Sequence, residues 1–257
     1  MNSDSFPSTQ RSRVAVAGGT GVVGRQVVHA LTRAGHEPVV LARSVGVDLV
    51  TGAGLDAALS GVDAVVDVSN IATQRRRRAV DFFTTATHNL LAVGGRAGVR
   101  HHVALSIVGV DRVNLGYYAA KLAQESLVLA SSTGTVLRAT QFHEFADLML
   151  ARSKGPVVPV PRMRIQPIAA AEVAVALAEL AVGPAQARAA DLGGPEEYWL
   201  AELLRRRLQA RPQRRWVVEV RLPGRLGSAL ANGALLPVGN GPRGRQTFSE
   251  WLAAAGN

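Results

Sequence analysis

The sequence contains no cysteine, so it can form no disulfide and no thiolate metal site, and it offers no cysteine nucleophile. Long apolar runs are also missing, because none approaches the roughly 20 residues that cross a bilayer. The first residues, 1–12, are polar and lack the apolar core of a signal peptide. We therefore expect a disordered tail at 1–12, no contact with membranes and a cytoplasmic location.

Lysine is almost absent, although the net charge of the 257-residue chain is +10. The two lysines are Lys121 and Lys154, and the arginines cluster at 75–78, 205–207 and 211–215. Clustered arginines also suit nucleic-acid binding. However, no aromatic residues alternate with these clusters to stack on bases. We interpret the charge as a solvated basic surface with pockets for anionic ligands, and we expect no nucleic-acid partner.

One stretch near the N-terminus organises the rest of the chain. Residues 13–24 read RVAVAGGTGVVG: a β-branched run, then glycines that include Gly18, Gly21 and Gly24, then apolar residues at helical spacing. Strand, tight turn and helix in this order predict a dinucleotide-binding turn, whereas a glycine-rich hairpin or linker needs neither flanking element. The glycines permit the reversal, let a pyrophosphate lie against bare backbone, and let helix and strand pack closely. The predicted cofactor contacts here are Gly18, Thr20, Gly21, Val22, Val23 and Gly24.

The next strand predicts which dinucleotide binds. Residues 38–42 form an apolar run that ends at Arg43 and Ser44. In dinucleotide folds an acidic residue at this place holds the ribose 2′-hydroxyl of NAD, whereas a guanidinium can bind a 2′-phosphate bidentately. We therefore predict NADP(H) in preference to NAD(H), with Arg43 and Ser44 as contacts. The alternative is that Arg43 is an ordinary surface residue.

The remaining periodicity predicts an α/β fold. Apolar runs indicate strands at 45–50, 62–68, 99–106, 136–140 and 165–168, and helical spacing indicates helices at 55–59, 75–93 and 170–181. This alternation predicts a Rossmann-type doubly wound parallel sheet. Ligands bind at the carboxyl ends of such strands, so Ser69 and Asn70 are further predicted cofactor contacts. His101 and His102 are adjacent on a strand and point to opposite faces, so we expect no metal site there.

A serine, a tyrosine and a lysine are spaced for proton transfer. Ser106 ends a predicted strand, and Tyr117 and Lys121 are four residues apart, on one face of a helix. A tyrosine with its ordinary pKa of about 10 transfers protons poorly at neutral pH, and a nearby ammonium lowers that pKa. Tyr117 is then a general acid or base for a carbonyl/alcohol pair, with Ser106 bonding the same oxygen. The alternative is that Tyr117 and Tyr118 are packing aromatics and Lys121 is a surface charge.

Together these motifs resemble a known family. The segments GGTGVVG (18–24), YYAAK (117–121) and LRATQFHE (137–144), with Arg43 and Ser106, resemble atypical short-chain dehydrogenase/reductase proteins of the NAD(P)H-binding, NmrA-like and epimerase-dehydratase-like kind. The motifs are spread over more than half of the chain. The resemblance implies that the tyrosine is the acid/base, that the lysine holds the nicotinamide ribose as well, and that the serine orients the substrate.

The resemblance also implies a domain layout. One domain is expected over 13–257, with a dinucleotide-binding core at 13–140 and a small C-terminal lobe whose substrate-binding segments are about 141–165 and 190–250. The predicted contacts beyond the core strands are Thr140 for the cofactor and Gln141, Phe142 and His143 for the substrate. A stiff extended loop at 156–161 and an apolar stretch at 221–241 are expected to wall and cover the cleft. The family's third strand often ends in Gly-Asp, and Gly52-Ala53 stands here instead.

These observations lead to one expected function and two alternatives. We expect an NADP(H)-dependent oxidoreductase that interconverts a carbonyl and an alcohol on a small, fairly apolar metabolite. Epimerase or dehydratase chemistry on the same fold is the first alternative, and a non-catalytic NADP(H)-sensing regulator is the second. The expected partner is a small-molecule substrate, and the sequence leaves open whether the protein forms a homodimer.

Overall fold

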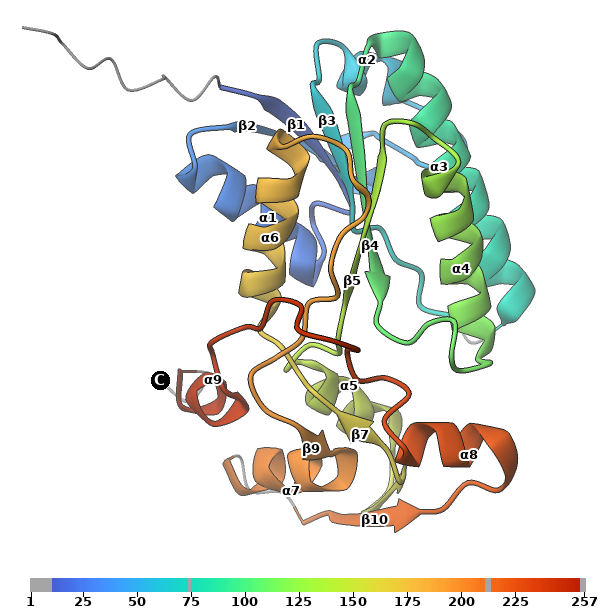
Figure 1. The fold of residues 1–257 in the computed structure, drawn as a ribbon, viewed down its shortest axis with the longest axis vertical. Coiled ribbons are helices and arrows are strands. Elements are labelled where there is room, and N and C mark those ends of the chain that lie inside the picture. Colours follow the sequence, from blue (N-terminus) through green and yellow to red (C-terminus); the bar gives the residue numbers. More distant parts are fainter. Residues whose placement is uncertain (1–10, 74, 211–213, 255–257) are drawn as a thin grey trace, which may run out of the picture.

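A six-stranded parallel sheet forms the centre of the structure (Figure 1). This computed structural model describes residues 11–73, 75–210 and 214–254. In spatial order the strands are β2 (Glu37–Leu41), β1 (Arg13–Ala17), β3 (Ala64–Asp67), β4 (His101–Ile107), β5 (Gly134–Ala139) and β8 (Ala187–Arg188). Every adjacent pair runs parallel, so the carboxyl ends of the strands share one edge of the sheet.

Helices cover both faces of this sheet, as its buried strands require. Helices α1 (Val22–Arg33) and α6 (Ala170–Val182) lie on one face, and α2 (Leu55–Leu59), α3 (Arg76–Ala97) and α4 (Gly116–Leu129) lie on the other (Figure 1). Apolar side chains of β1 and β3 alternate between the two helical layers, and each layer contributes its own core cluster. The predicted doubly wound, Rossmann-type α/β fold is therefore confirmed.

The strand order reverses at β1. The chain passes from β1 outward to β2 and then returns to β3 on the other side of β1. In such sheets a crevice opens at the reversal point, outside the carboxyl ends of the strands. A Cβ on Gly18, which follows β1, would lie 2.9 Å from the Cα of Ser69, which follows β3. The predicted cofactor residues of both strand ends therefore lie side by side at the crevice.

A smaller C-terminal lobe has a hydrophobic core of its own. Its elements are α5 (Phe145–Arg152), β6 (Val157–Pro161), β7 (Arg164–Ile165), β9 (Tyr198–Trp199), α7 (Leu200–Ala210), β10 (Trp216–Val220), α8 (Gly224–Ala231) and α9 (Phe248–Ala254). Strand β6 pairs parallel with β10, and β7 pairs antiparallel with β9. Apolar side chains from these elements, such as Ile165, Leu203 and Phe248, are buried together.

The lobe contacts the loop between β4 and α4. A Cβ on Gly109 in that loop would lie 2.0 Å from the Ala234 carbonyl oxygen, so the two backbones touch. The Arg112 guanidinium donates a hydrogen bond to the Leu236 carbonyl oxygen over 2.9 Å. The apolar stretch predicted to cover the cleft, 221–241, therefore meets the loop that leads into α4.

The predicted strand at 45–50 is wrong. Residues Arg43–Val45 form a short 3-10 helix instead, and the chain then turns. The Asp48 carboxylate accepts the backbone N–H groups of Val50 and Thr51, over 2.8 and 3.1 Å, which closes a turn in place of a strand ladder. Of the apolar residues of this run, Val47 and Leu49 are buried between the sheet and helices α2 and α3, whereas Val45 and Val50 are exposed, so the pattern reflects packing and not extended pairing.

Helix α3 extends beyond the predicted end at residue 93 and passes through Gly94 and Gly95. The helix ends at Ala97, where Gly98 takes φ 80 as a left-handed cap. Gly94 lies within the helix, and a Cβ on it would come 3.4 Å from the Val99 Cβ. Gly94 therefore packs in ordinary contact with the chain that follows, and it does not terminate the helix.

The C-terminal strands also differ from the prediction. Residues Val157–Pro161 form β6 and not a loop, with Val158 and Val160 in the core of the lobe. Of the predicted strand at 165–168, the structure retains β7, Arg164–Ile165, which pairs with β9 outside the main sheet. The main sheet ends with β8, which is two exposed residues long and shows no apolar pattern in the sequence.

Part of the predicted disordered tail is fixed against β2. The Ser12 N–H donates to His36 Nδ1 over 3.2 Å, and Arg11 lies 3.6 Å from the Glu37 carboxylate. These contacts hold Arg11 and Ser12 against the start of β2. The rest of that prediction, residues 1–10, lies outside the described residues.

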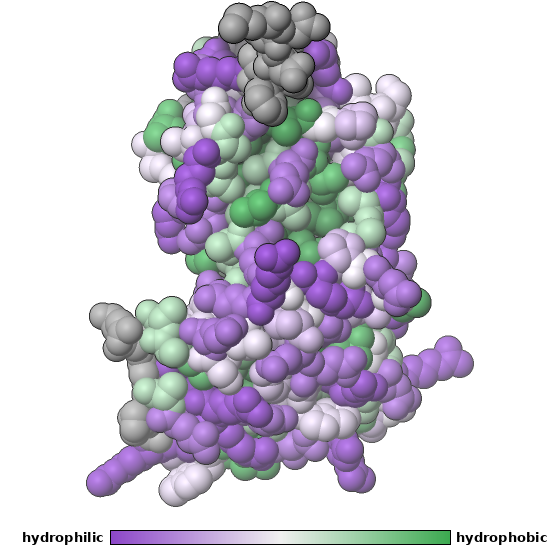
Figure 2. All heavy atoms as spheres, turned by 60° about the vertical axis from the view of Figure 1, so that its left-hand side comes forward, coloured by the Kyte–Doolittle hydropathy of each residue, from purple (hydrophilic) through white to green (hydrophobic). Residues whose placement is uncertain are grey.

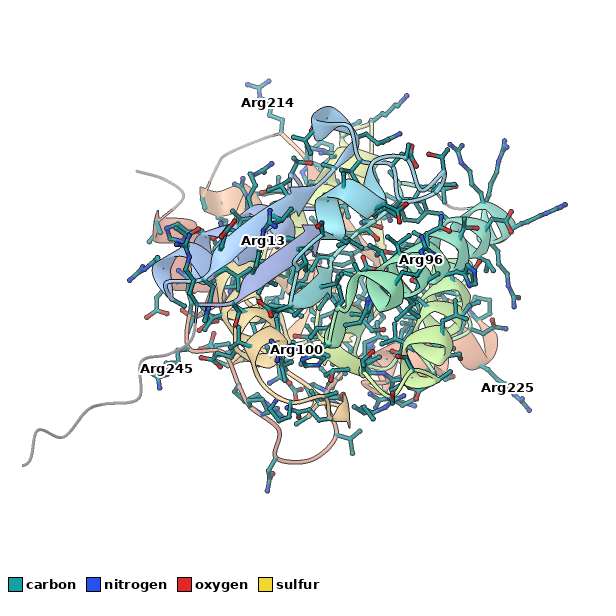
Figure 3. The ribbon with its side chains drawn as sticks, turned by 90° about the horizontal axis from the view of Figure 1, so that it is seen from above. Arg13, Arg96, Arg100, Arg214, Arg225 and Arg245 are labelled. Atoms are coloured by element: carbon teal, nitrogen blue, oxygen red, sulfur yellow. The ribbon has the colours of Figure 1, made fainter. Side chains whose placement is uncertain are left out.

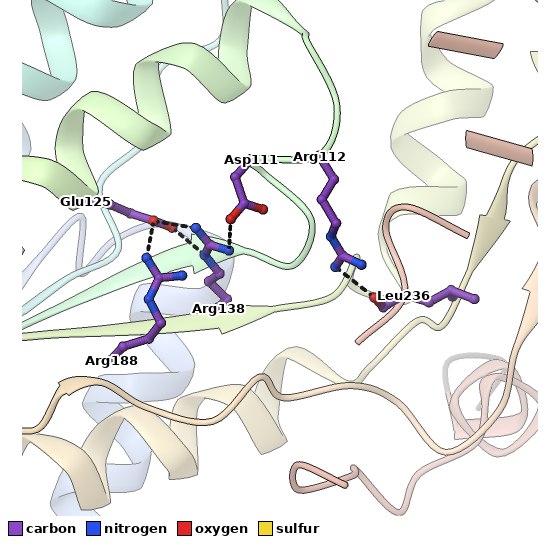
Figure 4. A network of polar contacts seen from close by, with 6 residues as sticks. All are labelled: Asp111, Arg112, Glu125, Arg138, Arg188 and Leu236. Atoms are coloured by element: carbon purple, nitrogen blue, oxygen red, sulfur yellow. Dashed lines mark hydrogen bonds and ion pairs between the residues drawn. The ribbon is translucent and has the colours of Figure 1, made fainter. Parts of the chain in front are cut away.

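A buried ion cluster fastens α4 to the sheet (Figure 4). Arg138 on β5 donates to both carboxylate oxygens of Glu125 on α4, over 2.9 and 2.8 Å, and to Asp111 over 2.9 Å. Arg188 on β8 reaches the same Glu125 carboxylate over 3.3 Å. Burial acts to lower the pKa of Arg138, but the hydrogen bonds and charges of the two acids outweigh it and raise that pKa. The cluster therefore sets the position of α4 relative to β5.

The variant Arg138→Met should destabilise the protein strongly. It leaves the Glu125 carboxylate buried with Arg188, and removing one partner of a buried pair costs about 3–5 kcal/mol. Chemical denaturation measures this free energy of unfolding. The control is Arg96→Met, because its exposed pair with Asp56 contributes at most about 1 kcal/mol. Equal losses in the two variants would contradict a role for the buried cluster.

Candidate dinucleotide and proton-transfer site

The turn between β1 and α1 has the geometry that its glycines predict. Gly18 takes φ 79, and a Cβ on Gly24 would lie 2.1 Å from the Gly18 carbonyl oxygen, so neither position accommodates a side chain. No side chain caps the start of α1 and its first turn has no acidic residue, so its backbone N–H groups suit an anion. Of the other predicted contacts in this turn, Thr20, Gly21 and Val22 are exposed and Val23 is buried.

The residues predicted to select the dinucleotide lie beside this turn. Arg43 and Ser44 begin the 3-10 helix that follows β2, and both are exposed. The Gly18 N–H donates to the Leu41 carbonyl oxygen over 3.0 Å, which joins the end of β2 to the glycine turn. The Arg43 guanidinium is therefore on the same side of the crevice as the glycine turn. It suits a phosphate on the ribose of a dinucleotide bound there.

The end of β3 adds polar groups to the crevice. The buried Asp67 carboxylate accepts the Ser69 N–H over 2.9 Å. Ser69 is 6% exposed, and its Oγ has no hydrogen-bond partner among the described residues. A buried hydroxyl without a partner needs an explanation, and a ligand in the crevice supplies one. The bare glycine turn and this hydroxyl together fit a bound dinucleotide.

Tyr117 reaches from α4 to the end of β3. Its hydroxyl donates to Asn70 Oδ1 over 2.8 Å, and its ring meets Phe83 edge-on with centroids 5.7 Å apart. Burial raises the pKa of Tyr117 far above its ordinary value, and Tyr118 adds to the rise. The expectation that Lys121 lowers this pKa is therefore wrong, because enclosure of the ring dominates. Burial thus favours the neutral, protonated form of Tyr117.

Lys121 lies one turn further along α4 and points into the protein. Its Nζ donates to the Leu105 carbonyl oxygen over 2.6 Å and to Gln124 Oε1, and it lies 4.6 Å from the centroid of the Phe83 ring. Burial lowers the pKa of Lys121 to about 8, although the Asp67 carboxylate acts in the opposite direction. With 5% of the residue exposed, the alternative that Lys121 is a surface charge is wrong.

Ser106 lies directly after the residue that Lys121 contacts. It is 4% exposed, and its Oγ has no hydrogen-bond partner in the described part of the chain. The structure therefore brings Ser106 and Lys121 together at the end of β4, and Tyr117 and Asn70 together at the end of β3. These strand ends are neighbours in the sheet, so the four residues share one edge of the crevice.

The residues predicted after β5 have unequal surroundings. Thr140 is buried and donates to the Gln166 carbonyl oxygen over 2.5 Å, so its hydroxyl holds two backbone segments together. Gln141 is half-buried, and neither of its amide atoms has a partner among residues that the structure describes. Gln141 lies beside Tyr118, whose pKa burial raises to about 12. An unpartnered amide beside a buried phenol is suited to a substrate contact.

The last two predicted substrate contacts lie within packed regions. Phe142 packs against the core between the sheet and α6. His143 is fully buried, with Nε2 3.1 Å from the Gln246 carbonyl oxygen and its ring against Phe248 and Trp251. Burial lowers the pKa of His143, so its imidazole is neutral near pH 7.

Two buried polar residues of the site escaped the sequence analysis. Gln124 Nε2 donates to Asp67 Oδ2 over 2.8 Å, and the oxygen of the same amide accepts from Lys121. The signals were present: an acid within an apolar strand, and a polar residue three positions after Lys121 on the same helix face. Neither signal predicts that Asp67 and Gln124 contact each other, because the two residues are far apart in the chain.

The adjacent histidines of β4 do face opposite sides, as predicted. His101 Nδ1 lies 3.0 Å from the Gly183 carbonyl oxygen and its Nε2 lies 2.8 Å from Thr135 Oγ1. His102 is buried on the α4 side, where the charge of Asp67 reaches it. Within residues 11–73, 75–210 and 214–254, no group of three potential metal-ligand side chains occurs.

The basic charge is spread over the molecular surface. In Figure 3, Arg214, Arg225 and Arg245 project outward on different sides of the molecule, and Arg96 and Arg100 pair with acids over 2.9 and 2.7 Å. On the face shown in Figure 2, the C-terminal lobe is mostly hydrophilic and apolar side chains gather over the sheet-containing half. A groove of about 570 Å³ between α1 and α6 contains none of the predicted site residues. No helix in the described ranges combines the length and hydropathy needed to cross a membrane.

A sheet of this order, with a glycine turn at its reversal point, is the architecture of dinucleotide-binding α/β proteins. No model of a known protein family matches the chain, and no curated protein matches it by sequence. Solved structures do match it by fold. A short-chain dehydrogenase/reductase superfamily protein from Agrobacterium tumefaciens, with bound NAD, gives a TM-score of 0.68 at 20% identity, over 95% of this chain and 96% of that one.

Two further structures show the range of proteins with this fold. UDP-N-acetylglucosamine 4-epimerase from Bacillus cereus gives a TM-score of 0.68 at 17% identity, over 95% of this chain and 96% of that one. NADPH-dependent quinone oxidoreductase from Escherichia coli gives 0.62 at 17% identity, over 95% and 100%. The structural neighbours are thus short-chain dehydrogenase/reductase proteins and related NAD(P)-binding enzymes. The likeness at these identities is one of fold.

Burial of Lys121 predicts how stability depends on pH. Its folded pKa of about 8 lies below the ordinary 10.5, so above pH 8 the unfolded chain holds a proton that the folded chain has released. Stability contributed by this residue therefore rises with pH from about 8 to 10.5, by roughly 3 kcal/mol. The measurement is the difference in free energy of unfolding between the protein and Lys121→Met across this range.

The control for that measurement is the chain's other lysine. Lys154 is exposed, so the difference between the protein and Lys154→Met should stay constant with pH. A constant difference for Lys121→Met as well would show that its ammonium is not desolvated.

Proposed function

We propose that this chain is an NADP(H)-dependent oxidoreductase that reduces a carbonyl, or oxidises an alcohol, on a small and fairly apolar metabolite. The observation that carries the proposal is the hydrogen bond from Tyr117 to Asn70, which holds a phenol at the carboxyl end of β3. This strand borders the reversal point of the sheet, where the bare glycine turn suits a pyrophosphate. A proton-transfer group and a cofactor cradle therefore share one crevice.

Tyr117 is the general acid in this proposal. Because its pKa is raised, the phenol stays protonated and can donate to a carbonyl oxygen that gains negative charge during reduction. In the reverse direction the same oxygen takes the proton of the alcohol, which requires the phenolate to be stabilised in the crevice. When bound, the nicotinamide supplies or accepts the hydride. Burial outweighs any contribution of Lys121 to stabilising the phenolate, so the geometry favours the direction in which Tyr117 donates its proton.

Ser106 and the C-terminal lobe complete the proposed pocket. The unpartnered Ser106 hydroxyl is a donor that can orient the same substrate oxygen as Tyr117. Leu235 and Leu236 are buried in the segment that contacts the β4–α4 loop, so apolar side chains lie near this side of the proposed pocket. Gln141 offers a further polar contact. These features support a substrate that is mostly apolar, with one reacting oxygen.

The preference for NADP(H) rests on Arg43. No acidic residue stands at the end of β2 to bind a ribose hydroxyl, and the guanidinium there suits a 2′-phosphate. Both NAD and NADPH occur among the structural neighbours, so the preference is argued from this residue alone.

The variant Tyr117→Phe tests the proposed chemistry. Loss of the proton donor should reduce kcat by about 10²- to 10⁴-fold, while the dissociation constant for NADPH stays within about threefold. Carbonyl substrates are screened by NADPH oxidation, and cofactor binding is measured by fluorescence titration. The matched control is Tyr118→Phe, which removes the neighbouring buried hydroxyl and should retain turnover.

The result also separates an enzyme from a sensor. Unchanged turnover in Tyr117→Phe would rule out the mechanism. NADPH binding without turnover of any carbonyl or alcohol in the intact protein would favour the non-catalytic regulator.

Epimerase or dehydratase chemistry is the second candidate function. It is favoured by the close match in length and fold to the Bacillus cereus 4-epimerase. Such chemistry would use the same Tyr117 proton transfer, but with transient oxidation and no net consumption of the dinucleotide. Product analysis by mass spectrometry, with the dinucleotide balance measured in parallel, distinguishes the two reactions.

The variant Arg43→Ala tests the cofactor preference. Loss of a charge-assisted contact should weaken NADPH binding about 10- to 100-fold and leave NADH binding unchanged. Fluorescence titration with both cofactors measures the effect. The control is Arg96→Ala, which removes an exposed arginine that is not a predicted cofactor contact. Equal weakening of both cofactors, or tighter NADH binding by the intact protein, would overturn the preference.

A further inference from the structure

Burial leaves the Lys121 ammonium in need of a counter-charge. It is 5% exposed, and a charged group in such surroundings is costly unless a partner compensates it. Two carboxylates are near enough to raise its pKa, those of Asp67 and Glu125. Glu125 already pairs with Arg138 and Arg188, so its charge is compensated within the ion cluster of Figure 4. Asp67 is therefore the carboxylate that compensates the positive charge of Lys121.

Asp67 meets Lys121 through one amide. Gln124 Nε2 donates to Asp67 Oδ2 over 2.8 Å, and Gln124 Oε1 accepts from Lys121 Nζ. A carboxylate only accepts and an ammonium only donates, so the chemistry of the two ends dictates the orientation of the amide between them. The other Asp67 oxygen accepts the Ser69 N–H over 2.9 Å, which fixes the carboxylate to the end of β3.

We propose that Asp67 and Gln124 form a buried relay that holds Lys121 in place and keeps it charged beneath the proton-transfer site. The relay extends from β3 to α4, and the Leu105 carbonyl oxygen on β4 takes a second N–H of the ammonium. One N–H of Lys121 is then left for a ligand in the crevice. Asp67 and Gln124 are positioning residues, because they act on the reaction only through Lys121. The role of this relay in a reaction rests on the proposed function, whereas the contacts that form the relay do not depend on it.

Other charged and titratable groups face the relay. His102 on β4 is buried next to Asp67, and Glu125 and Tyr117 share helix α4 with the lysine. From α3, the neutral ring of Phe83 lies against the ammonium. Burial lowers the pKa of His102 and raises that of Tyr117, so both are neutral near pH 8. The titration of Lys121 in this range therefore reports on Asp67 and Gln124.

The scarcity of lysine makes a direct test practical. In protein labelled with ¹⁵N-lysine, the side-chain signals come from Lys121 and Lys154 alone. The variant Lys154→Arg assigns them, and exposed Lys154 is an internal reference in every sample. Following the Nζ resonances by NMR from pH 6 to 11 gives the pKa of Lys121 without any substrate.

Two near-isosteric variants should lower that pKa. Asp67→Asn removes the charge and keeps the shape, and Gln124→Leu removes the bridge and keeps the bulk. Each should lower the pKa of Lys121 by about 1 or more and leave Lys154 unchanged. The effect of Asp67→Asn should shrink by at least half in the Gln124→Leu background, because the bridge that carries it is gone. Asp81→Asn, an exposed acid on α3, is the control and should change neither lysine.

The outcomes separate this proposal from simpler ones. If both variants lower only the melting temperature and leave the pKa of Lys121 unchanged, the two residues are merely structural and the proposal fails. If Asp67→Asn has its full effect without Gln124, the carboxylate acts through space and the relay is overturned. Failure to find any turnover would remove the proposed oxidoreductase function and leave the lysine titration standing.

Discussion

The inward face of α4 imposes the main constraint on this structure. Lys121, Gln124 and Glu125 are buried along it, where a helix against a sheet ordinarily presents apolar side chains. Buried polar groups are costly without partners, so each demands a specific group from the sheet. The partners are the Leu105 carbonyl oxygen, the Asp67 carboxylate and the Arg138 guanidinium. A shift of the helix by one turn would break all three contacts at once, so they fix its register against β3, β4 and β5.

The same constraint places the candidate chemistry. Tyr117 precedes Lys121 by one turn on α4, so fixing the helix also fixes the phenol, which then meets Asn70 at the end of β3. That strand end touches the glycine turn, because Gly18 has no side chain to separate it from Ser69. The contacts that pack the buried polar side chains of α4 against the sheet therefore also position the residues of the crevice. The stability of the fold and the geometry of the site depend on the same contacts.

Burial acts on the two titratable groups of α4 in opposite directions. It raises the pKa of Tyr117 and lowers that of Lys121 to about 8, because it disfavours the charged form of each. The phenol is thus kept as a proton donor, and the ammonium depends on nearby carboxylate for its charge. The protonation states in this site depend more on nearby fixed charges than on the ordinary pKa values of its residues. Those charges come from Asp67 on β3 and from the ion cluster around Glu125.

The sequence by itself determined the features whose causes are local. The Gly18 carbonyl oxygen leaves no room for a side chain at Gly24 within the same turn, and Tyr117 and Lys121 share a face because a helix repeats every 3.6 residues. The tertiary structure decided the rest. The run at 45–50 forms turns in which Val47 and Leu49 pack against the sheet and helices α2 and α3, and β8 is a strand through its pairing with the edge of β5. Asp67 and Gln124 are 57 residues apart, and only the parallel sheet and the helix packed on it bring that carboxylate and amide together.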